Sequence, residues 1–287
     1  MTSFSAERLD SYLAGVQHLP PAPTLMIRLI DLFQQPDRDT DEVIGLMRQN
    51  PPLCAEILRR CNGSFFGNDE PIGEIGEAVF RMGFYEVYRF TVALFGMQTM
   101  ASAKHVQGID VEAVWGHSAI VAATAGVLAR ELREPEGTAF TAGLLHDVGK
   151  VVLALAEGKK YGEILSRNPP AGRSLVAAER AAFGFNHTET GAWLLSCWGV
   201  PDEVAMPVLY HHDTNWVGDH GRAAAILNLA DLMAHGLGGD SDQQEDHLAE
   251  ASHAMELLEL TSDNLKELAV LVQVDLKRLG SVLSFQN

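Results

Sequence analysis

Apolar residues recur at three- and four-residue spacing along nearly the whole chain, which is the pattern of amphipathic helices. After the stiff segment Leu19–Pro23, which cannot itself be helical, leucines repeat at positions 25, 29 and 32. The same spacing runs from Ile75 to Met97, and Gly83 predicts a division of that stretch into two helices. The sequence shows no sustained alternation of apolar and polar residues of the kind a sheet requires. The pattern therefore predicts an all-α protein.

The polar stretch between positions 103 and 110 predicts a boundary between two helical lobes. We expect an N-terminal helical lobe over residues 1–110 and a second helical lobe over residues 111–235. Residues 236–287 are expected to form an acidic linker, with the sequence GLGGDSDQQED at 236–246, and C-terminal helices that pack back onto the protein. The acidic residues of this region indicate either a solvated helix face or an acidic interaction tail.

Length and charge narrow the classes of function. The 287 residues suffice for roughly two lobes, each large enough to bury a core. Asp and Glu (38) outnumber Lys and Arg (21), and the formal net charge of −17 argues against binding a nucleic-acid backbone. The N-terminus does not resemble a signal peptide, the apolar stretch 119–129 is shorter than the roughly 20 residues that span a bilayer, and the three cysteines form no CxxC pair. We expect a cytoplasmic protein that does not bind membranes.

Histidine and aspartate recur within or at the ends of otherwise apolar helical segments of the second lobe. They are His117, His146, Asp147, His187, His211, His212 and Asp231. A buried polar side chain needs a partner, so any one of these histidines taken alone is interpreted as a hydrogen-bonded core residue. Five imidazoles and two carboxylates from several helices favour a metal site instead. Both ligand types suit Fe, Mn, Zn or Ni, and a shared carboxylate can bridge two ions.

The order of these residues resembles the HD-domain superfamily of metal-dependent phosphohydrolases, and AGLLHDVGK at 142–150 is its most specific string. The span from about 15 to 235 more closely resembles the HDOD family, the HD-related output domain of bacterial signalling. The other motifs that carry this resemblance are HLPP at 18–21, NPPL at 50–53, CNGSFFG at 61–67, PIGEIGEAVFRMGF at 71–84 and FGFNHTETGAWLLSCWGVP at 183–201. The resemblance implies that the second lobe is an HD-like helical bundle.

The resemblance also implies roles for individual residues. The seven His and Asp side chains fall on the superfamily's metal-ligand positions, and Asp147 falls on the position that bridges two ions, so one or two divalent ions are expected. Lys150 falls where catalytic relatives contact the substrate phosphate. Gly149 is interpreted either as room for that phosphate or as a helix-packing position. His235, four residues after Asp231, is interpreted either as a surface residue or as a support for a metal ligand.

Two departures from the pattern argue against hydrolysis of cyclic di-GMP. The related phosphodiesterases follow the double histidine with an acidic, glycine-rich loop that contains Gly-Tyr-Pro, whereas this chain continues with DTNWVGDH at 213–220. Some of those enzymes also place a glutamate four residues before the first histidine of the pattern. Ala113 occupies that position here, so a third metal is not expected.

Proteins of the HDOD family are regarded as signalling output modules without a demonstrated common enzymatic activity. We therefore expect a regulatory module that acts through signalling protein partners, with a homodimer as one candidate arrangement. Two alternatives stay open: a metal-dependent phosphohydrolase acting on a phosphoester or nucleotide, and a sensor whose ferrous site reports iron or oxygen. An open cleft above the ligands would favour an enzyme, whereas a closed site would favour the regulatory role.

Overall fold

The computed structural model describes residues 9–13, 22–35, 39–63, 71–101, 108–167, 172–213, 218–237 and 244–279, together with Val16, Leu19 and Val106. All regular secondary structure within these residues is helical, which confirms the all-α prediction. Beyond a short helical segment at 9–13, the helices are α2 (Thr24–Gln34), α3 (Thr40–Arg48), α4 (Pro51–Cys61), α5 (Ile75–Met82), α6 (Phe84–Ala101), α7 (Val111–Glu131), α8 (Glu136–Leu145), α9 (Val148–Arg167), α10 (Gly172–Phe183), α11 (His187–Trp198), α12 (Asp202–Tyr210), α13 (Gly221–Leu237), α14 (Gln244–Leu258) and α15 (Ser262–Leu279).

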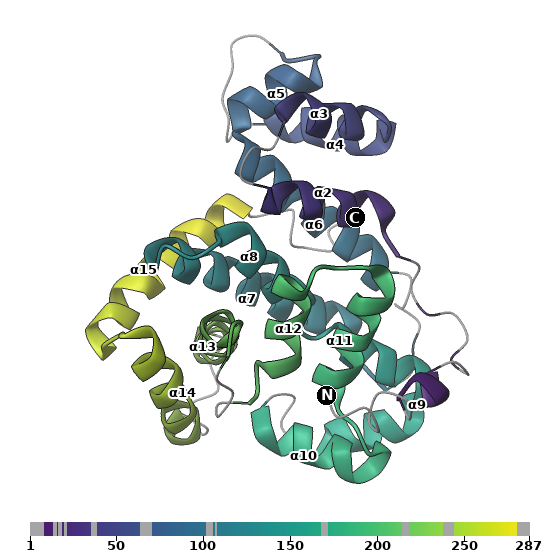
Figure 1. Ribbon diagram of the computed structural model, residues 1–287, viewed down its shortest axis with the longest axis vertical. Coiled ribbons are helices and arrows are strands. Elements are labelled where there is room, and N and C mark those ends of the chain that lie inside the picture. The colour runs from purple at the N-terminus through teal and green to yellow at the C-terminus, as the bar shows by residue number, and fades with distance from the viewer. Residues whose placement is uncertain are drawn as a thin grey trace.

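The first helices form a small lobe at one end of the molecule (Figure 1). There α3, α4 and α5 pack against one another, and α6 runs from this lobe down to α7 and α8. Gly83 separates α5 from α6 with a φ of 84°, a left-handed conformation that glycine adopts without strain. The predicted division of this stretch at Gly83 is therefore confirmed.

The second group of helices forms a bundle built around α7, α8 and α13. Beside this centre α9 packs on α11, and α12 contacts α8, α11 and α13. By length and composition alone, α7 and the stretch Glu136–Arg167 could cross a membrane, but 67% and 83% of their most apolar windows are buried inside the protein. Burial of this kind is what core helices of a soluble bundle show.

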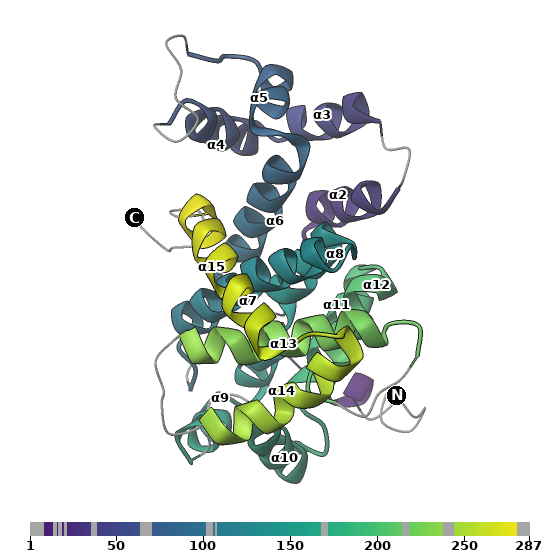
Figure 2. The ribbon, with the colours of Figure 1, turned by 90° about the vertical axis from the view of Figure 1, so that its left-hand side faces the viewer.

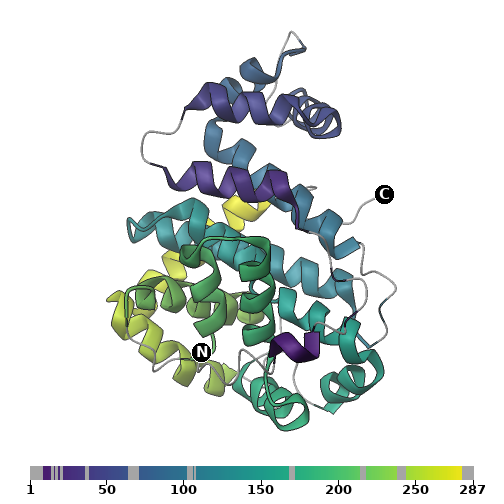
Figure 3. The same cartoon turned by 45° about the vertical axis from the view of Figure 1, so that its right-hand side comes forward.

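Residues 9–13 lie against the second bundle, although the sequence assigned them to the first lobe (Figure 3). The Tyr12 hydroxyl donates a hydrogen bond to Glu157 at 2.8 Å, and the Tyr12 ring meets Phe185 edge-on. One continuous hydrophobic core includes residues of both lobes. The lobes are thus held together by a shared core as well as by the chain that joins them, and their division at residue 110 stays a prediction.

The C-terminal helices pack back onto the bundle, as the sequence predicted (Figure 2). α14 lies on α13, and α15 lies on α7. Of the predicted acidic linker at 236–246, residues 236–237 end α13, residues 244–246 begin α14, and residues 238–243 lie outside the described residues. Asp275 of α15 accepts hydrogen bonds from Arg89 of α6, so the last helix also fastens the helix that leads to the first lobe.

Candidate metal centre

His146 and Asp147 form the short turn between α8 and α9, in the middle of the bundle. Gly143, in the last turn of α8, lies so close to α7 that a Cβ there would come within 2.7 Å of the Ala122 Cα. This close approach of the two helices takes the turn into the core. His146 and Asp147 are each only 1% exposed.

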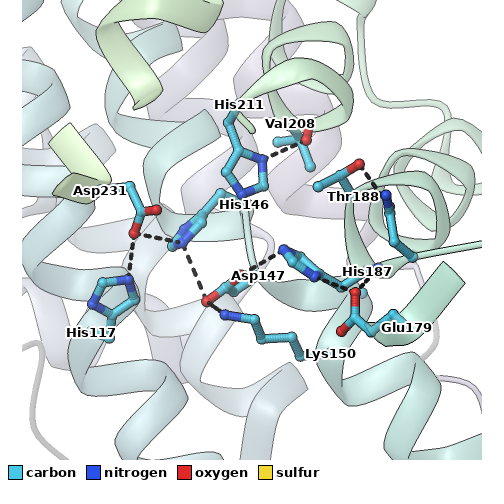
Figure 4. Close-up of polar contacts among 12 residues, drawn as sticks. His117, His146, Asp147, Lys150, Glu179, His187, Thr188, Val208, His211 and Asp231 are labelled. Carbon is cyan, nitrogen blue, oxygen red and sulfur yellow. Dashed lines mark hydrogen bonds and ion pairs between the residues drawn. The ribbon is translucent and has the colours of Figure 1, made fainter. Parts of the chain in front are cut away.

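Neighbouring helices bring further predicted side chains to this turn (Figure 4). His117 of α7 and Asp231 of α13 face one another, with His117 Nε2 2.8 Å from Asp231 Oδ1. The same Asp231 oxygen is 3.8 Å from His146 Nε2. On the other side of the turn, His187 Nε2 is 3.7 Å from Asp147 Oδ1.

The double histidine that follows α12 completes the cluster. The ring centroids of His146 and His211 are 5.2 Å apart, as are those of His187 and His212. Ligand atoms of His187, His211 and His212 lie within 4.8 Å of one another, and so do those of His117, His146 and Asp147. The structure therefore brings all seven predicted side chains together.

Three of the histidines are held with the Nε2 atom facing the cluster. Their Nδ1 atoms each lie beside an acceptor: the Gly143 carbonyl at 2.8 Å from His146, the Val208 carbonyl at 2.7 Å from His211, and the Glu179 carboxylate at 2.7 Å from His187. An acceptor at Nδ1 requires the proton there and leaves the Nε2 lone pair for another partner in the neutral ring. Metal-binding histidines are commonly oriented in this way.

Three buried atoms of the cluster lack a hydrogen-bond partner among the described residues: Asp147 Oδ1, His187 Nε2 and His211 Nε2. Leaving such groups unpaired in the core is unfavourable by roughly 1–3 kcal/mol each. One or two divalent cations would give these atoms partners, and imidazole nitrogen with carboxylate oxygen is a donor set suited to Fe, Mn, Zn or Ni. The residues present therefore fit a transition metal.

The electrostatics of the cluster favour the metal-binding protonation states of two histidines and both carboxylates. At His146 burial alone would lower the pKa, but Asp147 and Asp231 outweigh burial and raise it. Burial, reinforced by the neighbouring histidines, lowers the pKa of His211 to about 3 and the pKa of His212 well below its usual range. Burial alone would raise the pKa values of Asp147 and Asp231, but the histidines around both, together with Lys150 beside Asp147, outweigh burial and lower both well below the usual range. At neutral pH the cluster thus presents neutral His211 and His212 rings and ionised carboxylates.

Lys150 is buried and faces the cluster instead of solvent. Its Nζ donates a hydrogen bond to Asp147 Oδ2 at 2.6 Å, and the side chain is 6% exposed. In this arrangement the ammonium group offsets the charge of Asp147, the carboxylate that the superfamily pattern places as a bridge between two ions. A substrate phosphate would have to share this ammonium group with Asp147.

Gly149 is a helix-packing position, so the phosphate alternative raised by its place in the motif is not supported. A Cβ on Gly149 would lie 1.9 Å from the His187 carbonyl oxygen and 2.6 Å from the Gly191 nitrogen. Only glycine lets α9 approach α11 this closely. The contact sets the position of His187 relative to Asp147.

Sequence reasoning missed Glu179, which is fully buried in α10. Its carboxylate accepts hydrogen bonds from the His187 backbone N–H and ring Nδ1 and from the Tyr161 hydroxyl. Burial alone would raise the pKa of Glu179, but His187 outweighs burial and lowers it. Its spacing could have identified it. Glu179 lies four residues after Leu175 and four before Phe183, which places it on the buried face of the helix.

His235 lies beside the cluster, which favours its interpretation as a support for a ligand over that of a surface residue. Its Nε2 is 3.4 Å from Asp231 Oδ1, and its ring stacks on His117 with centroids 4.4 Å apart. Ligand atoms of His117, Asp231 and His235 lie within 4.8 Å of one another. His235 thus adds an eighth side chain to the cluster.

Glu179→Gln should weaken metal binding by about 10- to 100-fold, the usual effect of removing such a partner. A glutamine amide has one oxygen, which cannot accept from both the His187 ring and the Tyr161 hydroxyl. Even where it faces His187, a neutral oxygen holds the Nδ1 proton less firmly than the carboxylate does. Metal affinity is measured by competition with a chromophoric chelator. The matched control is Glu189→Gln, because a glutamine can still form the capping box that Glu189 makes with Asn186. Equal affinities of the two variants would contradict the positioning role of Glu179.

Comparisons with known proteins identify the family and the fold. The HDOD domain family model matches residues 19–214. Among solved structures, an HDOD domain protein of Geobacter sulfurreducens superposes with a TM-score of 0.72 at 22% identity, covering 98% of this chain and 100% of that one. A candidate signal transduction protein of Marinobacter aquaeolei VT8 has a TM-score of 0.74 at 23% identity, covering 96% of this chain and 65% of that one. A candidate phosphohydrolase of Shewanella amazonensis SB2B has a TM-score of 0.69 at 21% identity, with 96% of each chain covered.

The curated relatives are longer proteins that match in part. An uncharacterised protein of Treponema pallidum is 24% identical over 221 residues, which are 72% of this chain and 39% of that protein. Ribonuclease Y of Oleidesulfovibrio alaskensis is 32% identical over 137 residues, 43% of this chain and 24% of that enzyme. The chain thus spans well under half the length of these relatives. The family model, by contrast, covers more than half of the chain with the cluster's first six ligands inside it, and the chain belongs to the HDOD family.

Proposed function

We propose that this chain is a regulatory module of bacterial signalling that holds one or two divalent transition-metal ions in its His/Asp cluster and acts through protein partners. The observation that carries the metal is a set of three buried ligand atoms that have no hydrogen-bond partner among the described residues: Asp147 Oδ1, His187 Nε2 and His211 Nε2. The two sides of the cluster meet at Asp147, which supports a site for one ion or a bridged pair.

The burial of the ligands supports a regulatory role over a catalytic one. His146, Asp147, His187, His211 and Asp231 are each at most 3% exposed. A catalytic metal needs a coordination position that substrate and water can reach, whereas a structural or regulatory metal can be enclosed. His117 is more accessible, with a side chain 19% exposed, and marks the side from which an ion could enter.

Hydrolysis of a phosphoester is the second candidate, and the location of Lys150 beside Asp147 favours it. A bound divalent metal would lower the pKa of a coordinated water and neutralise charge on a phosphate. The chain's own contribution would be the Lys150 ammonium group as a phosphate contact. Because the ligands are buried, we place hydrolysis behind the regulatory role.

The ribonuclease activity named in the curated relatives is not extended to this chain. Those matches cover at most 28% of each ribonuclease Y, and the net charge of −17 opposes approach to an RNA backbone. A protein partner and a cytoplasmic location are therefore the setting that we propose.

Metal content tests the proposal. Protein purified without a histidine tag should contain about one or two Fe, Mn, Zn or Ni ions per chain by inductively coupled plasma mass spectrometry. The double variant His146→Ala/Asp147→Ala should lose this metal, because it removes a ligand from each side of the cluster. The control His253→Ala changes an exposed histidine of α14 and should keep the metal.

The same preparations, loaded with each metal, are then assayed on bis(p-nitrophenyl) phosphate. We expect no turnover above that of the double variant. Wild-type protein without metal, with the double variant folded equally well, would contradict the metal site. Hydrolysis that disappears in the double variant would favour the phosphohydrolase over the regulatory module.

A further inference from the structure

A cavity of about 800 Å³ lies between the two lobes, away from the His/Asp cluster. Phe33 and Gln34 of α2 and Tyr85 of α6 form its side toward the first lobe, and the first turns of α8, α12 and α13 form its opposite side. In Figure 1 this is the region where α2 lies over α8 and α12. A volume of this size is in the range of cavities that hold small molecules.

The charge lining the cavity is negative. Glu134, Glu136, Glu203 and Asp219 contribute carboxylates, His220 contributes an imidazole, and Arg222 is the one guanidinium or ammonium group among the described lining residues. Arg222 is already bonded to Glu134 at 2.8 Å. The described lining of the cavity therefore has more carboxylates than cationic groups to balance them.

Helix dipoles do not reverse this sign. The N-termini of α8, α12 and α13 at the cavity wall each carry about half a positive charge. Glu136, Glu203 and Asp219 lie in or just before those first turns, and a full negative charge at each exceeds the dipole. Glu136 also meets Arg130 at 3.3 Å, but that arginine side chain is 41% exposed and water screens the pair.

The remaining wall suits an apolar body. Phe33, Pro207, Ile226 and Leu227 line it, together with several alanines. Gln34 contributes a buried amide Nε2 that has no hydrogen-bond partner among the described residues. A ligand with an acceptor on its apolar part would satisfy that donor.

From this combination we propose that the interlobe cavity binds an organic cation, an amine attached to an apolar body that carries a hydrogen-bond acceptor. Glu136 is the principal partner of the amine, because it is the carboxylate at the start of α8 and its side chain is only 23% exposed. Burial raises the pKa of Glu136, and Arg130, Tyr85 and Arg89 offset this only in part, so a further cation beside the carboxylate would stabilise its charge.

The cavity contacts the same helices that carry the His/Asp cluster. α8 leads from Glu136 to His146, α12 leads from Glu203 to His211, and α13 carries Asp231 further along from Arg222. The amine would thus lie at the N-terminal ends of the three helices, with the cluster toward their C-terminal ends.

Three dansyl compounds test the proposal, because they share a fluorophore and sulfonyl acceptor and differ in charge. Dansylcadaverine is a cation, dansylamide is neutral and dansylglycine is an anion at neutral pH. Titration of full-length protein, followed by dansyl fluorescence, should show dansylcadaverine binding at least roughly tenfold more tightly than dansylamide and dansylglycine binding the weakest of the three.

Two variants locate the binding. Glu136→Gln should weaken dansylcadaverine binding by roughly tenfold. Glu131→Gln is its matched control, because Glu131 also meets Arg130 at 3.3 Å but does not line the cavity, and it should bind like wild type. Ala223 lines the cavity, so the ring added in Ala223→Phe should occupy part of the cavity volume and also weaken binding. Equal affinities for the cation and the neutral probe, no binding of the cation, or unchanged binding in Glu136→Gln and Ala223→Phe would each overturn the proposal.

Discussion

Gly149→Ala should destabilise the protein by at least about 3 kcal/mol and lower its metal content, the largest effect we expect from adding one methyl group. The added Cβ would lie 1.9 Å from the His187 carbonyl oxygen and 2.6 Å from the Gly191 nitrogen. Both neighbours are backbone atoms, so α9 and α11 would have to separate. This separation would lengthen the 3.7 Å distance between His187 Nε2 and Asp147 Oδ1, where the two sides of the cluster meet.

The measurements are urea unfolding followed by circular dichroism, and metal content of the folded protein. Gly116→Ala is the control, because Gly116 is also helical, precedes the cluster residue His117, and has nothing within 4 Å of an added Cβ. That control should be neutral or stabilising by up to about 1 kcal/mol, since alanine favours a helix. A Gly149→Ala protein with the unfolding midpoint and metal of wild type would refute the packing role.

Asp275→Ala should destabilise the protein by about 3–5 kcal/mol, because it leaves the buried Arg89 without its main partner. Arg89 and Asp275 are 1% and 5% exposed. Arg89 Nη1 donates to Asp275 Oδ1 at 3.0 Å, and Nη2 donates to the second oxygen. Glu86 accepts from Arg89 Nη1 alone, at 3.1 Å, and so does not replace this two-point contact.

Asp263→Ala serves as the control on the same helix. Asp263 pairs with Lys266 at 2.8 Å, but both side chains are more than three-quarters exposed, so its loss should change stability by less than about 1 kcal/mol. The double variant Arg89→Met/Asp275→Leu should recover most of the stability lost in Asp275→Ala, because no buried charge remains unpaired. Thermal unfolding of the four proteins decides this. A double variant as unstable as Asp275→Ala would contradict the charge-burial explanation.

The helices themselves could be predicted because their signals are local. Each signal involves residues that are close together in the sequence: apolar residues three and four apart, the glycine at position 83 and the leucines of the tail. The structure has helices where these signals predict them. The seven His and Asp positions were predicted from the order of motifs along the chain. Helical spacing alone does not show that these side chains lie close together, whereas the family pattern implies it.

The supporting residues could not be predicted in the same way. Glu179 looked like one charged residue on an amphipathic helix, and its role depends on the first residue of the next helix lying against it. The same limit applied to Gly149, for which packing and phosphate access were equally compatible with the motif. The choice between them needed the position of α11.

The sequence by itself determined an all-α chain, the division of helices at Gly83, helices in the tail and the residues of a His/Asp cluster. Only the tertiary structure decided that three of the histidines present Nε2 to the cluster, that Lys150 is bonded to Asp147, and that Arg89 pairs with a residue 186 positions away. The physical reason is range. Helix formation is governed by residues within a turn or two of one another, whereas hydrogen-bond partners, burial and pKa shifts depend on atoms that only the packing of distant helices brings together.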